Sequence, residues 1–172
     1  MQNVQFDAAG DLAISPSDTS SFSDFDFLIG SWQVRNVKLK TRLNGCTEWV
    51  EFVATQELRT VLFGQGNIDH FRTDFFGKPF EGLTLRLFNP LTRLWSIYWA
   101  DSNAVTLDAP VSGSFQDYIG YFFTRDSFEG KPIIMQFRWD ATNPEEPVWS
   151  QAFSADNGQS WEWNWYMYFS RL

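Results

Sequence analysis

Apolar and polar residues alternate with a period of two along most of this chain. The clearest case is the segment 161–169, where Trp161, Trp163 and Trp165 alternate with acidic, amide and phenolic residues. This period is the signature of a β-strand with one buried face. Three indoles on one face need a wide interior, so we expect them to line the inside of a barrel.

Similar segments, separated by turn signals, predict an all-β protein. Asn44-Gly45, Glu129-Gly130 and Asn157-Gly158 are typical of tight hairpins. The short spacing predicts an antiparallel up-and-down barrel of about 8–10 strands. A two-layer sandwich is the alternative, but its edge strands would be long and aromatic. We expect strands at about 31–40, 47–58, 67–73, 81–89, 93–101, 111–116, 118–128, 131–140, 147–155 and 161–171.

The first part of the chain has a different composition. Residues 1–23 are mostly small and polar, which predicts a flexible tail, and residues 24–172 form the barrel domain. An apolar cluster from Phe25 to Ile29 predicts a single helical turn that ends at Gly30.

Charge and cysteine content narrow the classes of function. The formal net charge is −8, which disfavours binding to nucleic acid or to an anionic membrane surface. The single cysteine, Cys46, cannot form an internal disulfide, which suits a reducing compartment. The N-terminal segment has no basic start and no long apolar run, so we expect a cytoplasmic location.

The segment Gly30-Ser31-Trp32 follows the helical turn and opens the first barrel strand. It resembles the first conserved block of lipocalins and their calycin relatives. The resemblance implies that Trp32 closes one end of the barrel and that a basic residue of a late strand, Arg171 or Arg138, packs across it. It also implies a barrel fold without an agreed activity.

Further segments resemble uncharacterised bacterial lipocalin-like proteins. They are Phe27–Trp32, Thr84–Phe88, Trp95–Asp101 and Gln151–Asp156. The chain lacks the disulfide of many secreted lipocalins, which argues against an extracellular carrier.

The segment from Ser154 to Trp161 matches the Asp-box pattern of sialidase propellers. A single copy does not predict a propeller, and the chemistry of the motif is local. Asp156 can accept hydrogen bonds from turn amides, and Gly158 can supply a positive φ. We therefore interpret the motif as a structural hairpin between the last two strands.

Strand alternation also selects candidate ligand-binding residues. If the tryptophan-bearing faces point inward, the interior contains the polar residues Glu51, Arg86 and Gln151. Tyr98, Tyr118 and Asn164 are secondary candidates, and the apolar wall includes Trp95, Trp99 and Trp165. A structural ion pair between Arg86 and Glu51, or an Arg86 on the solvent face, is the alternative interpretation.

Three functions remain open for such a barrel. The first is binding of a small apolar or aromatic ligand, with an anionic group near Arg86. The second is an isomerase, decarboxylase or lyase type of enzyme with Glu51 as base, Arg86 as anion stabiliser and Tyr98 beside them. The third is an interaction protein that forms a homodimer through the barrel wall. The positions of Glu51 and Arg86 relative to the wall distinguish the first two.

No cofactor is expected. His70 is the only histidine, and no Cys or His cluster accompanies it, so a zinc site is not predicted. A single axial histidine binds haem in some calycin-like barrels, but the position of His70 does not support this role. We interpret it as a surface or hairpin residue.

Overall fold

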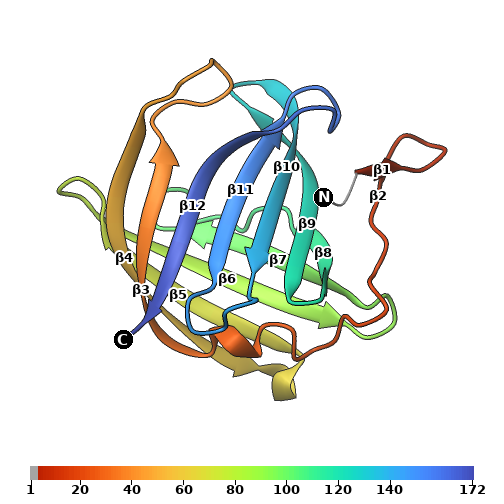
Figure 1. Cartoon of the computed structure of the whole chain (residues 1–172), viewed down its shortest axis with the longest axis horizontal. Coiled ribbons are helices and arrows are strands. Elements are labelled where there is room, and N and C mark those ends of the chain that lie inside the picture. The colour runs from red at the N-terminus through yellow and green to blue at the C-terminus, as the bar shows by residue number, and fades with distance from the viewer. Residues whose placement is uncertain (1–3) are drawn as a thin grey trace.

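The computed structural model describes residues 4–172 and contains a closed antiparallel barrel of ten strands (Figure 1). Each strand pairs with its neighbours in sequence, and β12 closes the barrel on β3. The predicted fold class is therefore confirmed. No helix among these residues is both long and apolar enough to cross a membrane. The barrel strands are β3 (Gly30–Leu39), β4 (Trp49–Val61), β5 (Gly66–Asp74), β6 (Pro79–Asn89), β7 (Leu94–Asp101), β8 (Val111–Gln116), β9 (Ile119–Phe128), β10 (Lys131–Asp140), β11 (Val148–Ser154) and β12 (Glu162–Arg171).

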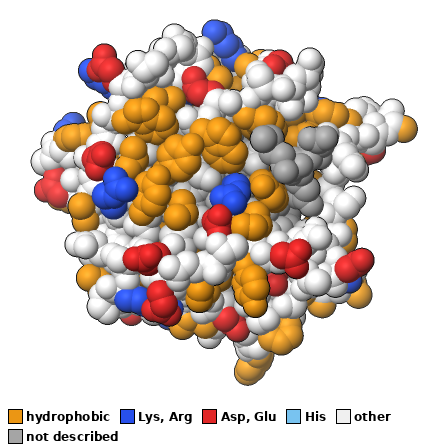
Figure 2. All heavy atoms as spheres, viewed as in Figure 1, with side chains coloured by type: hydrophobic (Ala, Val, Ile, Leu, Met, Phe, Trp, Pro, Cys, Tyr) orange, Lys and Arg blue, Asp and Glu red, His pale blue; other side chains and the backbone are white. Residues whose placement is uncertain are grey.

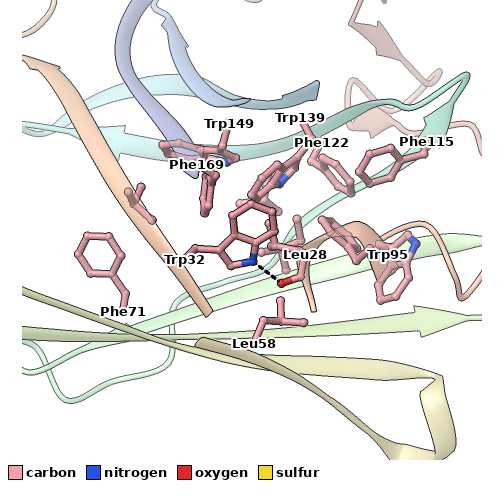
Figure 3. Close-up of a cluster of buried hydrophobic side chains, with 14 of the residues drawn as sticks. Leu28, Trp32, Leu58, Phe71, Trp95, Phe115, Phe122, Trp139, Trp149 and Phe169 are labelled. Carbon is pink, nitrogen blue, oxygen red and sulfur yellow. Dashed lines mark hydrogen bonds between the residues drawn. The ribbon is translucent and has the colours of Figure 1, made fainter. Parts of the chain in front are cut away.

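An aromatic plug fills one end of the barrel, which we call the closed end. The 3₁₀ turn η1 (Asp26–Leu28) lies across this end, at the bottom of Figure 1. Figure 3 shows Trp32 beside Leu28, with its indole Nε1 donating to the Leu28 carbonyl at 2.8 Å. Trp95, Phe115, Phe122, Trp139 and Phe169 belong to the same buried cluster. The second 3₁₀ turn, η2 (Leu62–Gly64), joins β4 to β5 at this end.

The basic residue that packs across Trp32 is Arg171. Its guanidinium carbon lies 3.8 Å from the centroid of the Trp32 ring. Its Nη1 and Nη2 donate to the carbonyls of Ile29 and Phe27, at 2.6 and 3.0 Å. Gly30 has a φ of 113°, and a Cβ there would lie 3.1 Å from Arg171 Nη1. The strand start, the tryptophan and the arginine thus form one structural unit.

Two tryptophans that we expected inside the barrel lie elsewhere. The register of β11 with β12 shifts between Gln151 and Ala152, so β12 contains one extra residue, Asn164. This β-bulge reverses the alternation. Trp165 points inward, whereas Trp163 stacks with Tyr166 on the outer face. Trp161 precedes the strand, in the turn region.

The N-terminal segment contacts the outside of the barrel. It begins with a small hairpin of β1 (Gln5–Phe6) and β2 (Leu12–Ala13), at the right of Figure 1. Further along, the Ser17 amide donates to Ser114 Oγ at 3.0 Å, and Arg93 Nη2 donates to the Ser17 carbonyl at 2.9 Å. The predicted tail is therefore in contact with the barrel, while its flexibility stays a prediction.

Candidate functional site

A cavity of about 360 Å³ occupies the barrel interior between the aromatic plug and the opposite, open end. Asp108, in the segment between β7 and β8, and Thr124 and Asp126, in the second half of β9, line it toward the open end. Its walls are mainly apolar and include seven aromatic side chains, as is usual for pockets that hold small organic molecules. The aromatic lining includes Phe71, Trp99, Phe137, Trp139, Trp149 and Trp165.

Arg86 is the charged residue in the deep part of this cavity. It lies on the inner face of β6, and its side chain is 4% exposed. Nη1 donates to Asp69 Oδ2 at 2.6 Å and to Asn67 Oδ1 at 3.1 Å. The guanidinium carbon also lies 5.1 Å from the centroid of the Phe25 ring in the plug. A buried charge is tolerated only when it is paired, and Asp69 provides that pairing.

The polar groups around Arg86 are not fully satisfied. Arg86 Nε and Asp69 Oδ1 are buried and have no hydrogen-bond partner among the described residues. A buried polar atom without a partner costs about 1–3 kcal/mol. These two atoms are enclosed by the protein, so they add to the cost of the buried ion pair, while Arg86 lines the cavity with other atoms of its side chain.

Sequence reasoning missed Asp69 as the partner of Arg86. We expected Glu51, but Asn67 pairs directly with Arg86 in the β5–β6 register. Asp69 lies two residues from Asn67 and therefore on the same inner face. The alternation of Asn67, Asp69 and Phe71 with Ile68 was the available signal, although it gives no register by itself.

Glu51 and Tyr98 do not line the cavity. Glu51 is 60% exposed and pairs with Arg35 at 3.2 Å on the outer face of β4. Tyr98 lies between Ile97 and Trp99, which both line the cavity, so its side chain points to the other face of β7. The predicted interior position of Glu51 is wrong, and the Glu51–Arg86–Tyr98 set does not form one site.

The outward position of Glu51 follows from the pairing of β4 with β3. Trp32 points inward, and its partner across the sheet is Gln56, which lines the cavity. Even-numbered residues of β4 therefore face inward, and Trp49 and Glu51 face outward. The assumption that every tryptophan-bearing face is an inner face fails at β4.

The other predicted residues divide between cavity, plug and wall. Trp99, Gln151 and Trp165 line the cavity with Arg86, whereas Trp95 belongs to the plug, where its Nε1 donates to Asp24 Oδ2 at 3.0 Å. Gln151 Nε2 donates to Asn164 Oδ1 at 2.9 Å. The secondary candidate Tyr118 is 72% exposed in a turn at the closed end.

The Ser154–Trp161 motif forms a turn at the open end, with Asp156 at its centre. Asp156 Oδ1 accepts from the Ser160 amide at 2.9 Å and from Ser154 Oγ at 2.7 Å. These hydrogen bonds lower the pKa of Asp156 to about 2. Gly158 has a φ of 85°, and its amide donates to Ser154 Oγ at 2.7 Å. The contacts are those of a structural hairpin.

Comparison with known proteins adds no assignment. No protein-family model matches this chain, and no curated protein matches it either. The lipocalin-like family membership therefore stays a prediction, and the site has to be interpreted from its own chemistry.

His70 lies outside the cavity. It alternates with the inward residues Asp69 and Phe71, and its Nε2 is 3.4 Å from Glu81 Oε2 on the outer surface. Residues 4–172 contain no group of three or more His, Cys, Asp or Glu side chains that could hold a metal ion.

A second hollow, of about 620 Å³, lies on the outer surface of β4–β7. It is larger than the interior cavity. Its walls, however, are only the outer face of these strands and residues 105–107. A ligand there would keep much of its surface in water. We therefore place the candidate site in the interior cavity, whose walls surround a guest on several sides.

Proposed function

We propose that this protein binds a small, flat, largely apolar or aromatic molecule inside its barrel. The observation that carries the proposal is the 360 Å³ cavity with aromatic side chains in its walls and the buried Arg86 in its lining. Its volume lies within the range of about 300–1,000 Å³ that is usual for small-molecule pockets. Removal of aromatic surface from water provides the main driving force for binding.

The polar groups of the cavity would orient this ligand. Arg86 is already neutralised by Asp69 at 2.6 Å, so its remaining N–H groups suit a neutral acceptor such as a carbonyl or an ether. Thr84 and Gln56 add hydrogen-bonding side chains to the lining. A hydrogen bond from Arg86 to such an acceptor would fix the orientation of the ligand in the cavity.

Titration with phenylnaphthylamine, a neutral aromatic dye that fluoresces in apolar sites, tests this proposal. Val111 is 3% exposed and lines the cavity, so Val111→Trp would fill the space. We expect at least a tenfold loss of dye affinity in Val111→Trp. The matched control is Val53→Trp, at a position 56% exposed on the outer face, which should bind as the unmodified protein does. Equal affinity in the two variants would contradict binding inside the barrel.

Self-association is a second candidate function, and the pattern of the outer wall favours it. A row of paired residues crosses five strands, from Arg138 through Ser150, Tyr166 and Val37 to Glu51. Tyr166 on β12 is the centre of this row, and each end is an ion pair, Arg138 with Asp140 at 2.8 Å and Glu51 with Arg35 at 3.2 Å. Figure 2 shows hydrophobic side chains gathered on this face, with basic and acidic side chains together on either side of them.

We propose that a second copy of the chain is the partner for this face. A two-fold axis parallel to β12 would place Arg138 of each copy opposite Glu51 of the other. Tyr168, which is 36% exposed, would add apolar contact. We expect Arg138→Glu to shift sedimentation toward the monomer, and Arg138→Glu with Glu51→Arg to restore the dimer. An unmodified protein that sediments as a monomer at high concentration would contradict this proposal.

A further inference from the structure

Lys38 lies on the inner wall at the open end of the barrel. It is the penultimate residue of β3, and in the register it lies between Trp165 of β12 and Val50 of β4. Its Nζ is 3.9 Å from the centroid of the Trp165 ring. Trp165 lines the cavity, so the Lys38 ammonium group contacts a side chain that would also contact the ligand we propose.

The charge of Lys38 has no counter-ion in the described part of the chain. No carboxylate of residues 4–172 lies within 4 Å of its Nζ, and the side chain is only partly exposed. Lys40, two residues away, pairs with Glu48 at 3.0 Å. The difference matters because a partly buried cation without a partner loses hydration without receiving an ion pair in return.

The charged groups around Lys38 do not supply this partner. Arg42, in the loop after β3, places a second positive charge nearby. The Glu162 carboxylate of β12 interacts electrostatically with Arg42. Both oxygens of this carboxylate accept from the Leu43 amide at 2.9 Å. On the β4 side, Val50 is uncharged and Glu51 points outward to Arg35.

Arg42 also covers apolar surface at the open end. Its guanidinium carbon lies 5.6 Å from the ring of Phe128 and 5.7 Å from the ring of Phe153. Its Nε is buried without a hydrogen-bond partner among the described residues. Lys38 and Arg42 thus place an unpaired cation and an unused donor at the same end of the barrel.

We propose that Lys38 and Arg42 form an anion-binding subsite at the open end of the barrel, next to Trp165 of the cavity wall. This inference rests on the proposed function and specifies its ligand, which is an amphiphile with a flat apolar body and one anionic headgroup. The body occupies the aromatic cavity, and a carboxylate, sulfonate or phosphate group contacts Lys38. The anionic group is therefore beside Lys38 and not beside Arg86, whose charge Asp69 already neutralises.

Burial and the charge of Arg42 act on Lys38 in the same direction. Together they lower the pKa of Lys38 from 10.5 to about 8. An anion beside Nζ would stabilise the charged form and raise this pKa again. Anion binding should therefore weaken when the pH rises above the pKa of free Lys38.

Two dyes with the same ring system separate the headgroup from the body. Anilinonaphthalene sulfonate carries an anionic group that phenylnaphthylamine lacks. We expect Lys38→Met to raise the Kd of the sulfonate dye about tenfold and to change the Kd of the neutral dye less than about twofold. Lys38→Arg should retain most of the sulfonate affinity. The matched control Lys40→Met, at an exposed and ion-paired lysine, should change neither Kd.

A pH titration gives a second readout. In the unmodified protein, the preference for the sulfonate dye over the neutral dye should fall from about pH 7 to about pH 10, and in Lys38→Met it should be flat. A preference that is the same in Lys38→Met and in the unmodified protein, with the neutral dye still bound, would overturn the subsite and leave the proposed function intact. Failure of the unmodified protein to bind either dye would overturn both.

Discussion

The two ends of the barrel differ in how completely their polar groups are satisfied. At the closed end, Trp32 donates to the Leu28 carbonyl, and Arg171 donates to two carbonyls while it packs on the indole. At the open end, Lys38 has no carboxylate within 4 Å among the described residues. Arg86 lies deeper, 5.1 Å from the Phe25 ring of the plug, and is paired with Asp69 at the base of the cavity. The closed end therefore resembles a finished core, whereas the space above Arg86 and the unpaired Lys38 remain for a ligand.

Replacement of the plug residue should have the largest effect on stability. Trp32 is fully buried, so Trp32→Ala should lower the free energy of unfolding by about 4 kcal/mol because it leaves a large cavity. Trp49→Ala, at an exposed tryptophan on the outer face, should cost about 1 kcal/mol. Urea denaturation of both variants checks the difference, and equal losses would show that the closed end is not the stable half.

The buried ion pair should produce the next effect. Arg86→Met leaves the Asp69 carboxylate buried without a cation, which should cost about 3 kcal/mol. The double variant Arg86→Met with Asp69→Leu should recover most of this loss. A double-mutant cycle by urea denaturation measures the coupling, and additive losses would mean that the two side chains act independently.

Stability should also depend on the titration of Lys38. Its pKa is about 8 in the folded protein and 10.5 ordinarily, so the unfolded chain binds more protons between these values. The unmodified protein should therefore gain about 2 kcal/mol relative to Lys38→Met as the pH rises across this window. Thermal unfolding of both proteins at several pH values tests the sign. A constant difference would mean that Lys38 is not destabilised as a cation.

The smallest effect is expected at the hairpin of Asp156. Because its pKa is lowered to about 2, its stabilising contribution is present above the ordinary value of 3.8 and is lost as the pH falls through about 2. Asp156→Ala should lower the Tm slightly at neutral pH and not at the lowest pH. A Tm that is unchanged at pH 7 would argue against the structural role of this turn.

The fold was predictable because its signals are local. Period-two alternation and short turns such as Glu129-Gly130 located the ten barrel strands within a few residues of their observed bounds. The resemblance also implied the contact of a late basic residue with Trp32, which is Arg171. These features depend on neighbours in sequence or on one recurrent motif.

The site was less predictable because side-chain direction depends on pairing across strands. The register of β3 with β4 cannot be read from the sequence of the loop 40–48 that joins them. In the observed register the tryptophan-bearing face of β4 is an outer face, so our placement of Glu51 inside the barrel was wrong. The bulge at Asn164 reversed the alternation on β12. Lys38 gave no signal of its own, because a lysine in a strand normally faces solvent.

A crystal structure of the protein with phenylnaphthylamine would test the central claim most directly, which is that the barrel holds a guest between Arg86 and the open end. We expect electron density for the dye against Trp99 and Trp165, with the plug around Trp32 unchanged. Density for the dye only on the outer surface, with the aromatic side chains closed over an empty interior, would contradict the account.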